Sequence, residues 1–280
     1  MSHAAKEDLA RILGVRLVIG TGKYLGLSSM IAMSKTATYT YSKDRIWQKI
    51  NSWRGCTLSK TGKEVIIKYV LQSIPSYIMS IYVLPGTAIN DIERMLISLW
   101  WGGGRGTGDI KWITWERLAC PKALGGIGFR NFHDFNLAMV AKQGWNFLMN
   151  PTSLVSQIFK ARHFPRTSFL DAKLCFNPSY AWRSISMSRQ VLLHGCRWCI
   201  GDGSHIRATG YPWLHSKVRN LIPAPQNQGV YDLFLSDLLI DGVKEWDVDK
   251  VIELFSYERA RVVIQTSLFP SVQEDRVVWQ

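Results

Sequence analysis

The sequence lacks the residue patterns that the common hydrolytic and transfer chemistries need. It contains no Asp-Asp pair, which a polymerase hairpin would use to hold two divalent metal ions. It has no Gly-x-Ser-x-Gly elbow for a serine nucleophile. It has no glycine-rich loop that ends in Lys-Ser or Lys-Thr, as nucleoside triphosphate hydrolysis would require. These absences predict that the chain contains no catalytic residue of its own.

Acidic residues are scarce in two long blocks of the chain. Residues 1–70 carry 12 basic and 4 acidic groups, and residues 151–230 carry 10 and 2. The middle, residues 71–150, carries 7 and 5, while residues 231–280 reverse the balance with 5 and 10. The net charge is +13. Because a surface made basic only for solubility would be more even, the two blocks indicate a polyanionic partner, most simply nucleic acid.

Cysteine is too infrequent and too irregular for a disulfide framework. There are five cysteines, an odd number. Cys196 and Cys199 form a lone Cys-x-x-Cys pair, which is a weak zinc signal without a second pair. His194 and His205 lie near it in the sequence, but four ligands from one small hairpin would be cramped. We therefore predict no metal site.

Long hydrophobic runs are absent too. No apolar stretch approaches the roughly 20 residues that a membrane span needs. The first fifteen residues carry both charges without an apolar core, so no secretory signal is predicted. The expected setting is intracellular, with no membrane partner, and both the nucleus and an organelle such as the mitochondrion remain open.

The periodicity of apolar residues predicts a mainly α fold. Helices are expected at 36–53, from 59 to Pro75, and at 87–101, 131–149, 152–163 and 179–194, with short helical segments between 232 and 264. Small β elements are expected near the N-terminus, near 110–130 and at 197–207, where a hairpin would turn at Gly201–Gly203. With 47% hydrophobic residues the chain can form a real core.

The helix that follows residue 58 shows the clearest amphipathic pattern. Ser59 or Thr61 can cap it, and Thr61 with Glu64 fits a capping box. Its buried face is predicted to hold Val65, Ile66, Tyr69, Val70 and Ile74, which leaves Lys60, Lys63 and Lys68 pointing outward.

The stretch "WWGGGRGTGDIKWITW", residues 100–115, places four tryptophans beside five glycines. Trp100 and Trp101 are expected to close the core at a helix end, the usual fate of tryptophan. The glycines then make a basic turn in which Arg105 and Lys111 can contact phosphate. The alternation in "IKWITW" predicts a short strand.

Four longer stretches resemble one family. They are "GKYLGLSSM", "RIWQKINSWRGCTLSKTGKEVIIKYVLQSIPSYIMSIYVLP", "LWWGGG…IKWITWERLACPKALGGIGFRNFHDFNLAMVAKQGWNFL" and "IFKARHFPRTSFLDAKLCFNPSYAWRSI". Together they are similar to the reverse transcriptase polyproteins of plant non-LTR, LINE-type retrotransposons. The resemblance is dense over residues 11–215 and loose beyond.

The resemblance implies an organisation in four parts. Residues 1–35 would be the end of the palm with primer-grip-like strands, and residues 36–150 a helical thumb-like domain. Residues 151–230 would be a basic helical connection with a β-hairpin, and residues 231–280 an acidic segment that precedes a missing zinc-binding region. The catalytic carboxylates and their Mg²⁺ belong to the palm and fingers of the parent polymerase, so this chain alone is expected to be inactive and to need no cofactor.

The resemblance and the charge pattern together indicate which residues would bind RNA or RNA–DNA duplex. Phosphate contact and shape reading of a duplex need only lysine and arginine, and Tyr24 could press on a sugar. The second basic block also contains Lys173, Arg189, Arg197 and Arg207. The predicted nucleic-acid-binding residues are Lys23, Tyr24, Gly26, Arg54, Lys60, Lys63, Lys68, Arg105, Lys111, Lys160, Arg162, Arg166 and Arg183.

Three hypotheses follow for the whole chain. The first is a fragment of an RNA-directed DNA polymerase that binds primer–template duplex or RNA without sequence preference, with the missing palm and fingers as its partner. The second is a degenerate open reading frame without function. The third is a domesticated RNA-binding protein.

Overall fold

The computed structural model describes residues 11, 23–24, 27–28, 35–53, 56, 58–102, 110–174, 176–214, 233–240 and 242–279. Helices dominate it, and the strands form two small antiparallel sheets, so the predicted mainly α class is confirmed. The chain divides into unit 1, residues 1–75 with 84–131, and unit 2, residues 76–83 with 132–280. The four-part organisation stays a prediction. Among the described helices, none combines the length and apolar character that a membrane crossing requires.

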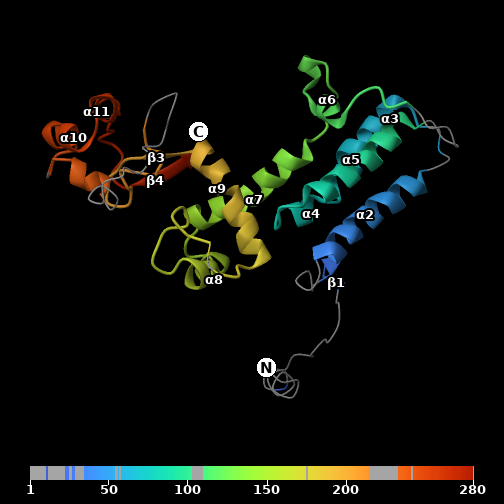
Figure 1. The fold of residues 1–280 in the computed structure, drawn as a ribbon, viewed down its shortest axis with the longest axis horizontal. Coiled ribbons are helices and arrows are strands. Elements are labelled where there is room, and N and C mark those ends of the chain that lie inside the picture. Colours follow the sequence, from blue (N-terminus) through green and yellow to red (C-terminus); the bar gives the residue numbers. More distant parts are fainter. Residues whose placement is uncertain are drawn as a thin grey trace. The chain divides into compact units, whose positions relative to one another are not determined.

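Unit 1 is built on two long helices, α2 (Lys35–Ser52) and α5 (Gly86–Trp101), which pack against each other (Figure 1). The short helix α3 (Lys60–Val65) also packs against α5. α5 owes its place to one apolar face, because side chains four residues apart lie on the same side of a helix. Fully or nearly fully buried core residues of unit 1 include Ile46, Ile67, Leu71, Ile89, Ile92 and Leu96.

The helix that begins with α3 differs from its predicted form. Ser59 caps it, accepting a hydrogen bond from the Gly62 backbone N–H at 3.1 Å, so the capping box between Thr61 and Glu64 was wrong. The helix continues as a π-helical turn over Ile66–Val70 and a 3₁₀ turn over Leu71–Ser73. A π turn holds more residues than an α turn, so it shifts which side chains face inward.

The predicted buried face of this helix was therefore wrong. Val65 and Tyr69 are 49% and 74% exposed, whereas Ile67 and Leu71 are fully buried. Ile66 and Val70 are only partly buried. The sequence here is apolar on nearly every side, so the contact with α5, rather than local periodicity, selects the buried positions.

The small β elements agree with the prediction in one place and not in another. β1 (Lys23–Tyr24) and β2 (Leu27–Ser28) pair antiparallel near the N-terminus, with Lys23 opposite Ser28. The strand expected near 110–130 is absent from the described residues 110–131. That segment instead holds α6 (Trp115–Ala119) and a 3₁₀ turn, Lys122–Leu124. The alternation of "IKWITW" fails as a strand signal because only Trp115 is buried, while Ile110 and Trp112 are exposed.

Unit 2 centres on a helix pair. α7 (Phe132–Met149) packs along α9 (Tyr180–Gly195), and α8 (Leu154–His163) and α4 (Ser76–Met79) also pack on α7 (Figure 1). Gly144 permits the close approach, since a Cβ there would lie 2.8 Å from the Phe169 ring and 2.9 Å from Leu192. Helices at 36–53, 87–101, 131–149, 152–163 and 179–194 are thus confirmed to within two residues at each end.

The segment 76–83 is tied to the helix pair by buried polar groups. Asn136 on α7 is 1% exposed, and its amide donates to the carbonyl oxygens of Met79 and Tyr82, both at 2.8 Å. The Tyr180 hydroxyl donates to the Val83 carbonyl at 2.6 Å. A buried amide left without such partners would be costly, so these bonds fix the segment in place.

The C-terminal part of unit 2 closes a second sheet. β3 (Cys196–Cys199) pairs antiparallel with β4 (Arg276–Trp279), with Cys196 opposite Trp279. The hairpin predicted within 197–207 was therefore wrong, because β3 finds its partner about eighty residues away. Arg207 instead bridges to Phe234. A 3₁₀ turn (Leu235–Leu238), α10 (Val248–Leu254) and α11 (Tyr257–Ile264) lie between.

Candidate nucleic-acid interface

Two of the predicted phosphate-binding lysines are used inside unit 1. The Lys60 ammonium donates to the Trp100 carbonyl at 3.0 Å and lies 5.0 Å and 4.9 Å from the ring centroids of Trp100 and Trp101. Lys63 is only 8% exposed and donates to the Gly102 carbonyl. These carbonyls belong to the C-terminal end of α5. The last carbonyl groups of a helix have no N–H partner within the helix, and this end carries partial negative charge. The two lysines therefore cap α5.

Lys68 has a similar internal role. It donates to the Glu64 carboxylate at 2.8 Å and to the Ile127 carbonyl at 2.7 Å. Glu64 also pairs with Lys122 at 2.9 Å. Hydrogen bonds from Lys68 and then Lys122 hold the pKa of Glu64 below its ordinary value. The prediction that Lys60, Lys63 and Lys68 form an outward cationic face was thus wrong for Lys63 and Lys68. Lys60 is exposed, but its ammonium is engaged.

Trp100 and Trp101 do close the core at the end of α5, as predicted. Trp100 is 7% exposed and meets Phe129 edge-on, with ring centroids 5.5 Å apart. Trp101 is partly buried. Lys60, one of the two lysines that cap this helix end, therefore also lies over both tryptophan rings, a favourable arrangement for a cation and a π face.

A pocket of about 370 Å³ opens in unit 1 between α5 and the segment that leads into α6. Lys111, one of the predicted phosphate contacts, lies on its wall beside Trp112, which is 73% exposed. Arg94 on α5 is also at the pocket and is 76% exposed along its side chain. The remaining lining residues are Asn90, Glu93, Ile97, Ile113, Thr114, Trp115 and Glu116.

The two carboxyl groups of this pocket differ in their electrostatics. Burial, and to a lesser degree the nearby Glu116, raises the pKa of Glu93 to about 7. A hydrogen bond from its own backbone N–H, followed by one from Thr114, lowers the pKa of Glu116. At neutral pH the pocket therefore contains one ionised carboxylate and one that is close to half-protonated.

A second cationic region lies in unit 2, where the end of α8 meets the start of α9. His163 stacks on Trp182, with ring centroids 4.7 Å apart and planes at 3°. Phe164 also stacks on Trp182, at 5.5 Å. These contacts bring the neighbours Arg162 and Arg183 to one part of the surface, and both are exposed. Burial, and then the adjacent Arg162, lowers the pKa of His163, which favours its neutral form.

Few acidic groups oppose these cations. The sequence has no acidic residue between Asp134 and Asp171. Asp171 accepts a hydrogen bond from the Tyr211 hydroxyl at 2.7 Å and lies 3.8 Å from the Arg207 guanidinium, so it is used internally. We call the exposed cations of this region the α8–α9 basic surface, which consists of Lys160, Arg162, Arg166 and Arg183.

An exposed aromatic ring lies on the loop that precedes α9. Phe176 is fully exposed, and Leu174 is 52% exposed. Nothing in the sequence "LCFNPS" distinguishes this phenylalanine from a core residue, so its exposure could not be predicted. Arg94 and Glu93 were likewise missed, because on α5 they look like ordinary residues of a solvated helix face.

Three other basic residues of the second block, Arg189, Arg197 and Arg207, are partly buried, whereas Lys173 is exposed. Arg189 is partly buried, donates to the Leu170 carbonyl at 3.1 Å and lies 5.5 Å from the Phe169 ring. Burial lowers its pKa. Arg197 is partly buried on β3, and Arg207 faces Asp171. Of the remaining predicted contacts, Gly26, Arg54 and Arg105 lie outside the described residues, and only the backbone of Lys23 and Tyr24 is described, in β1.

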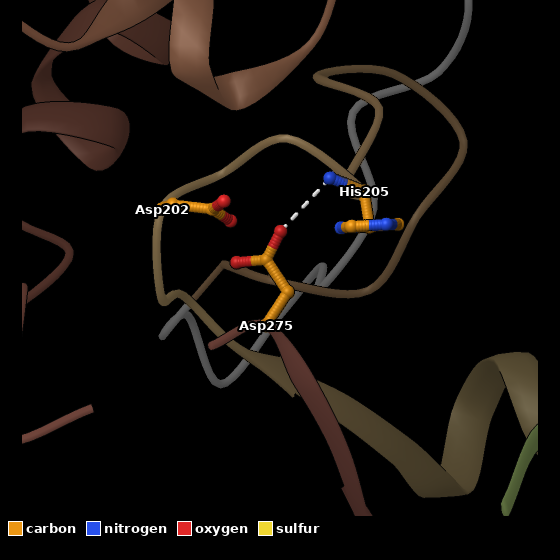
Figure 2. A group of neighbouring side chains, drawn as sticks. All are labelled: Asp202, His205 and Asp275. Atoms are coloured by element: carbon orange, nitrogen blue, oxygen red, sulfur yellow. Dashed lines mark hydrogen bonds between the residues drawn. The ribbon is translucent and has the colours of Figure 1, made fainter. Parts of the chain in front are cut away.

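Asp202, His205 and Asp275 bring their potential ligand atoms within 4.8 Å of one another (Figure 2). Asp275 accepts backbone N–H bonds from Gly201 at 2.7 Å, Gly203 at 3.0 Å and His205 at 2.9 Å. The Asp202 carboxylate accepts from the Ser204 backbone and hydroxyl, which lowers the pKa of Asp202. Since both carboxylates already bind the loop, this cluster is best explained as an anchor for residues 201–205.

The glycines of this loop fit the same explanation. A Cβ on Gly201 would lie 2.2 Å from the backbone of Glu274, and Gly203 adopts a φ of +75° that side chains disfavour. Cys196, on the adjacent strand, is buried, and burial raises the pKa of its thiol to about 11. Such a thiol is a poor metal ligand at neutral pH, because a metal binds the thiolate.

The chain is similar to two proteins of Arabidopsis thaliana. It is 32% identical over 154 residues to the uncharacterized mitochondrial protein AtMg00310 of Arabidopsis thaliana, and the match covers 55% of this chain and 97% of that protein. The chain belongs to the family of that mitochondrial protein. A search for matching family models found none.

A second Arabidopsis thaliana relative is longer. The chain is 27% identical over 243 residues to a protein named "Putative ribonuclease H protein At1g65750". The match covers 85% of this chain but only 39% of that protein. This chain therefore corresponds to well under half of the longer relative.

Proposed function

We propose that the chain derives from the reverse transcriptase region of a plant non-LTR retrotransposon and binds RNA or RNA–DNA duplex through phosphate contacts. The observation that carries the proposal is the α8–α9 basic surface, whose four cations are exposed and which has Asp171 as the only acidic residue between Asp134 and Asp202. The resemblance of four long stretches to such polyproteins supports the origin. The longer relative, whose name refers to a ribonuclease H, is consistent with it.

Physical reasoning favours nucleic acid over other anionic partners. The cations of the α8–α9 basic surface come from two helices and from the segment 164–179 that joins them, so they can follow a line of phosphates. The N-terminus of α9, capped by Ser179, adds the positive end of a helix dipole at the same place. Fully exposed Phe176 offers a face on which a sugar or base can stack. Such contacts read shape and charge rather than sequence.

The proposal assigns no polymerisation to this chain. Two Mg²⁺ ions would need several convergent carboxylates. Asp247 instead caps α10, accepting a hydrogen bond from the Lys250 backbone N–H at 3.1 Å, and Asp275 holds the 201–205 loop. The proposed activity is therefore binding alone, with catalysis supplied in the parent polymerase by other regions.

The test compares two sets of three substitutions in unit 2. One variant carries Lys160→Gln, Arg162→Gln and Arg183→Gln. Its control carries Lys250→Gln, Arg259→Gln and Arg261→Gln, which remove the same charge from exposed positions on α10 and α11. Fluorescence anisotropy with a labelled RNA–DNA hybrid is measured over a range of KCl concentrations. The first variant is expected to bind weakly, and the control to bind like the parent. Equal losses in both variants would show that net charge alone, and not this surface, drives binding.

A further inference from the structure

The pocket of unit 1 combines features that the proposed function leaves unused. Its walls are one face of α5 and residues 111–116, two segments of the same compact unit. Its volume of about 370 Å³ lies within the range of small-molecule sites and exceeds what a single planar base occupies. An aromatic ring, two cations and two carboxyl groups converge on it.

Burial among the described residues does not account for the position of Trp112. It is 73% exposed, whereas Trp115 three residues later is 3% exposed. Trp115 stacks on Phe129 with ring centroids 5.3 Å apart, and its indole N–H donates to the Arg130 carbonyl at 3.1 Å. The core of unit 1 thus uses Trp115 and leaves the indole of Trp112 at the pocket. An indole placed there offers a stacking platform for a planar ring.

The charges of the pocket select among planar ligands. The carboxyl groups of Glu93 and Glu116 disfavour a free anion inside the pocket but accept hydrogen bonds from ring and amino N–H groups. Lys111 and Arg94 line the same pocket, and Arg94 makes only a loose 4.0 Å pair with Asp91. This arrangement suits a ligand with an N–H-bearing ring on one side and a phosphate on the other.

We propose that this pocket takes one unpaired base of a single-stranded RNA, stacked on Trp112, with its amino or imino N–H groups bonded to Glu93 or Glu116. The adjoining phosphate contacts Lys111 or Arg94. A base within a duplex could not enter, since its hydrogen-bonding edge is already paired and its faces are stacked. The inference rests on the proposed function, because it presumes that the chain binds nucleic acid, and it adds a site for unpaired strands.

The experiment pairs two exposed tryptophans of unit 1. Trp112→Ala is compared with Trp47→Ala, because Trp47 is 55% exposed on α2 and does not line the pocket. Each full-length variant is titrated with a mixed-sequence single-stranded RNA and with a blunt RNA–DNA hybrid, and circular dichroism checks its fold. Trp112→Ala is expected to weaken single-strand binding about tenfold and leave hybrid binding unchanged. Trp47→Ala is expected to change neither.

Intrinsic fluorescence gives a second readout. Single-stranded RNA should quench the tryptophan emission of the parent protein more than that of Trp112→Ala. If the parent binds neither probe, the proposed function fails together with this inference. If the parent binds both probes and Trp112→Ala behaves like Trp47→Ala, the proposed function stands and the pocket inference is overturned. An equal loss on both probes in Trp112→Ala would overturn it as well, because a base pocket must discriminate against paired strands.

Discussion

Lys63 offers the sharpest test of the way unit 1 holds together. Its side chain is 8% exposed, and its ammonium donates to the Gly102 carbonyl, just beyond the end of α5. Replacing it with methionine keeps the apolar stem but removes the donor. A hydrogen bond to a charged group contributes about 1.5–3 kcal/mol, and burial of the thioether end offsets part of that. We therefore expect Lys63→Met to lower the free energy of unfolding by about 1–2 kcal/mol.

Charge reversal at the same position should cost more. In Lys63→Glu a carboxylate would face a carbonyl oxygen at the negative end of the α5 dipole, nearly out of contact with water. Removing one partner from a buried charged contact and leaving an uncompensated charge costs about 3–5 kcal/mol. A domain is stable by only about 5–15 kcal/mol, so unit 1 should be partly unfolded in this variant at room temperature.

The control is Arg45→Glu, an exposed charge reversal on α2. It should change stability by less than about 0.5 kcal/mol. Urea unfolding followed by tryptophan fluorescence measures all three variants, and the transition that reports on Trp100 and Trp101 should move. If Lys63→Glu unfolds at the same urea concentration as Arg45→Glu, the lysine faces solvent, and the outward cationic face expected from the sequence would be right after all.

Three further predictions concern single sites. Glu93 has a folded pKa of about 7, above its ordinary value of 4.5, so the folded state holds more protons and stability falls as pH rises between those values. At pH 8 the Glu93→Gln variant should therefore be more stable than the parent by about 1.5 kcal/mol, after discounting for partial exposure, and at pH 4 the two should be equally stable. Urea unfolding at both pH values measures the difference. Asp275→Asn should cost about 3 kcal/mol, because three backbone N–H groups lose an ionised acceptor, and hydrogen exchange at residues 201–205 should quicken. Trp182→Ala should cost about 3–5 kcal/mol in thermal unfolding, whereas Trp182→Phe should cost less, since the buried indole N–H has no hydrogen-bond partner among the described residues. Unchanged hydrogen exchange at residues 201–205 in Asp275→Asn would contradict the second prediction. Equal melting temperatures of Trp182→Ala and Trp182→Phe would contradict the third.

The helical part of this fold could be predicted from local sequence, and the β part could not. α5 and α9 each have one apolar face, so their positions follow from periodicity. β3 lies about eighty residues from its partner β4, and no local pattern encodes such pairing. In the α3 region nearly every residue from Val65 to Leu71 is apolar, so several faces were compatible with burial. Contact with α5, and the hydrogen bond that Lys63 donates to the Gly102 carbonyl, decided between them.

The candidate site was predictable to a similar degree. A basic block around Lys160, Arg162 and Arg183 is visible in the sequence, because Asp171 is the only acidic residue between Asp134 and Asp202. The sequence does not show which of the cations stay exposed. Arg189 carries the same charge but donates to the Leu170 carbonyl, and Arg207 faces Asp171. Likewise, sequence alone does not distinguish Trp112 from Trp115. Only the packing of Trp115 on Phe129 leaves the other ring exposed.

The most direct test of the central claim is the salt dependence of binding to an RNA–DNA hybrid. Each phosphate contact releases counterions, so the logarithm of the binding constant should fall linearly with the logarithm of salt concentration, by about 0.9 per contact. The variant with Lys160→Gln, Arg162→Gln and Arg183→Gln should show a slope that is shallower than the parent's by about 3. The control with Lys250→Gln, Arg259→Gln and Arg261→Gln should show the same slope as the parent. Identical slopes for all three proteins, or no measurable binding by the parent at low salt, would contradict the account.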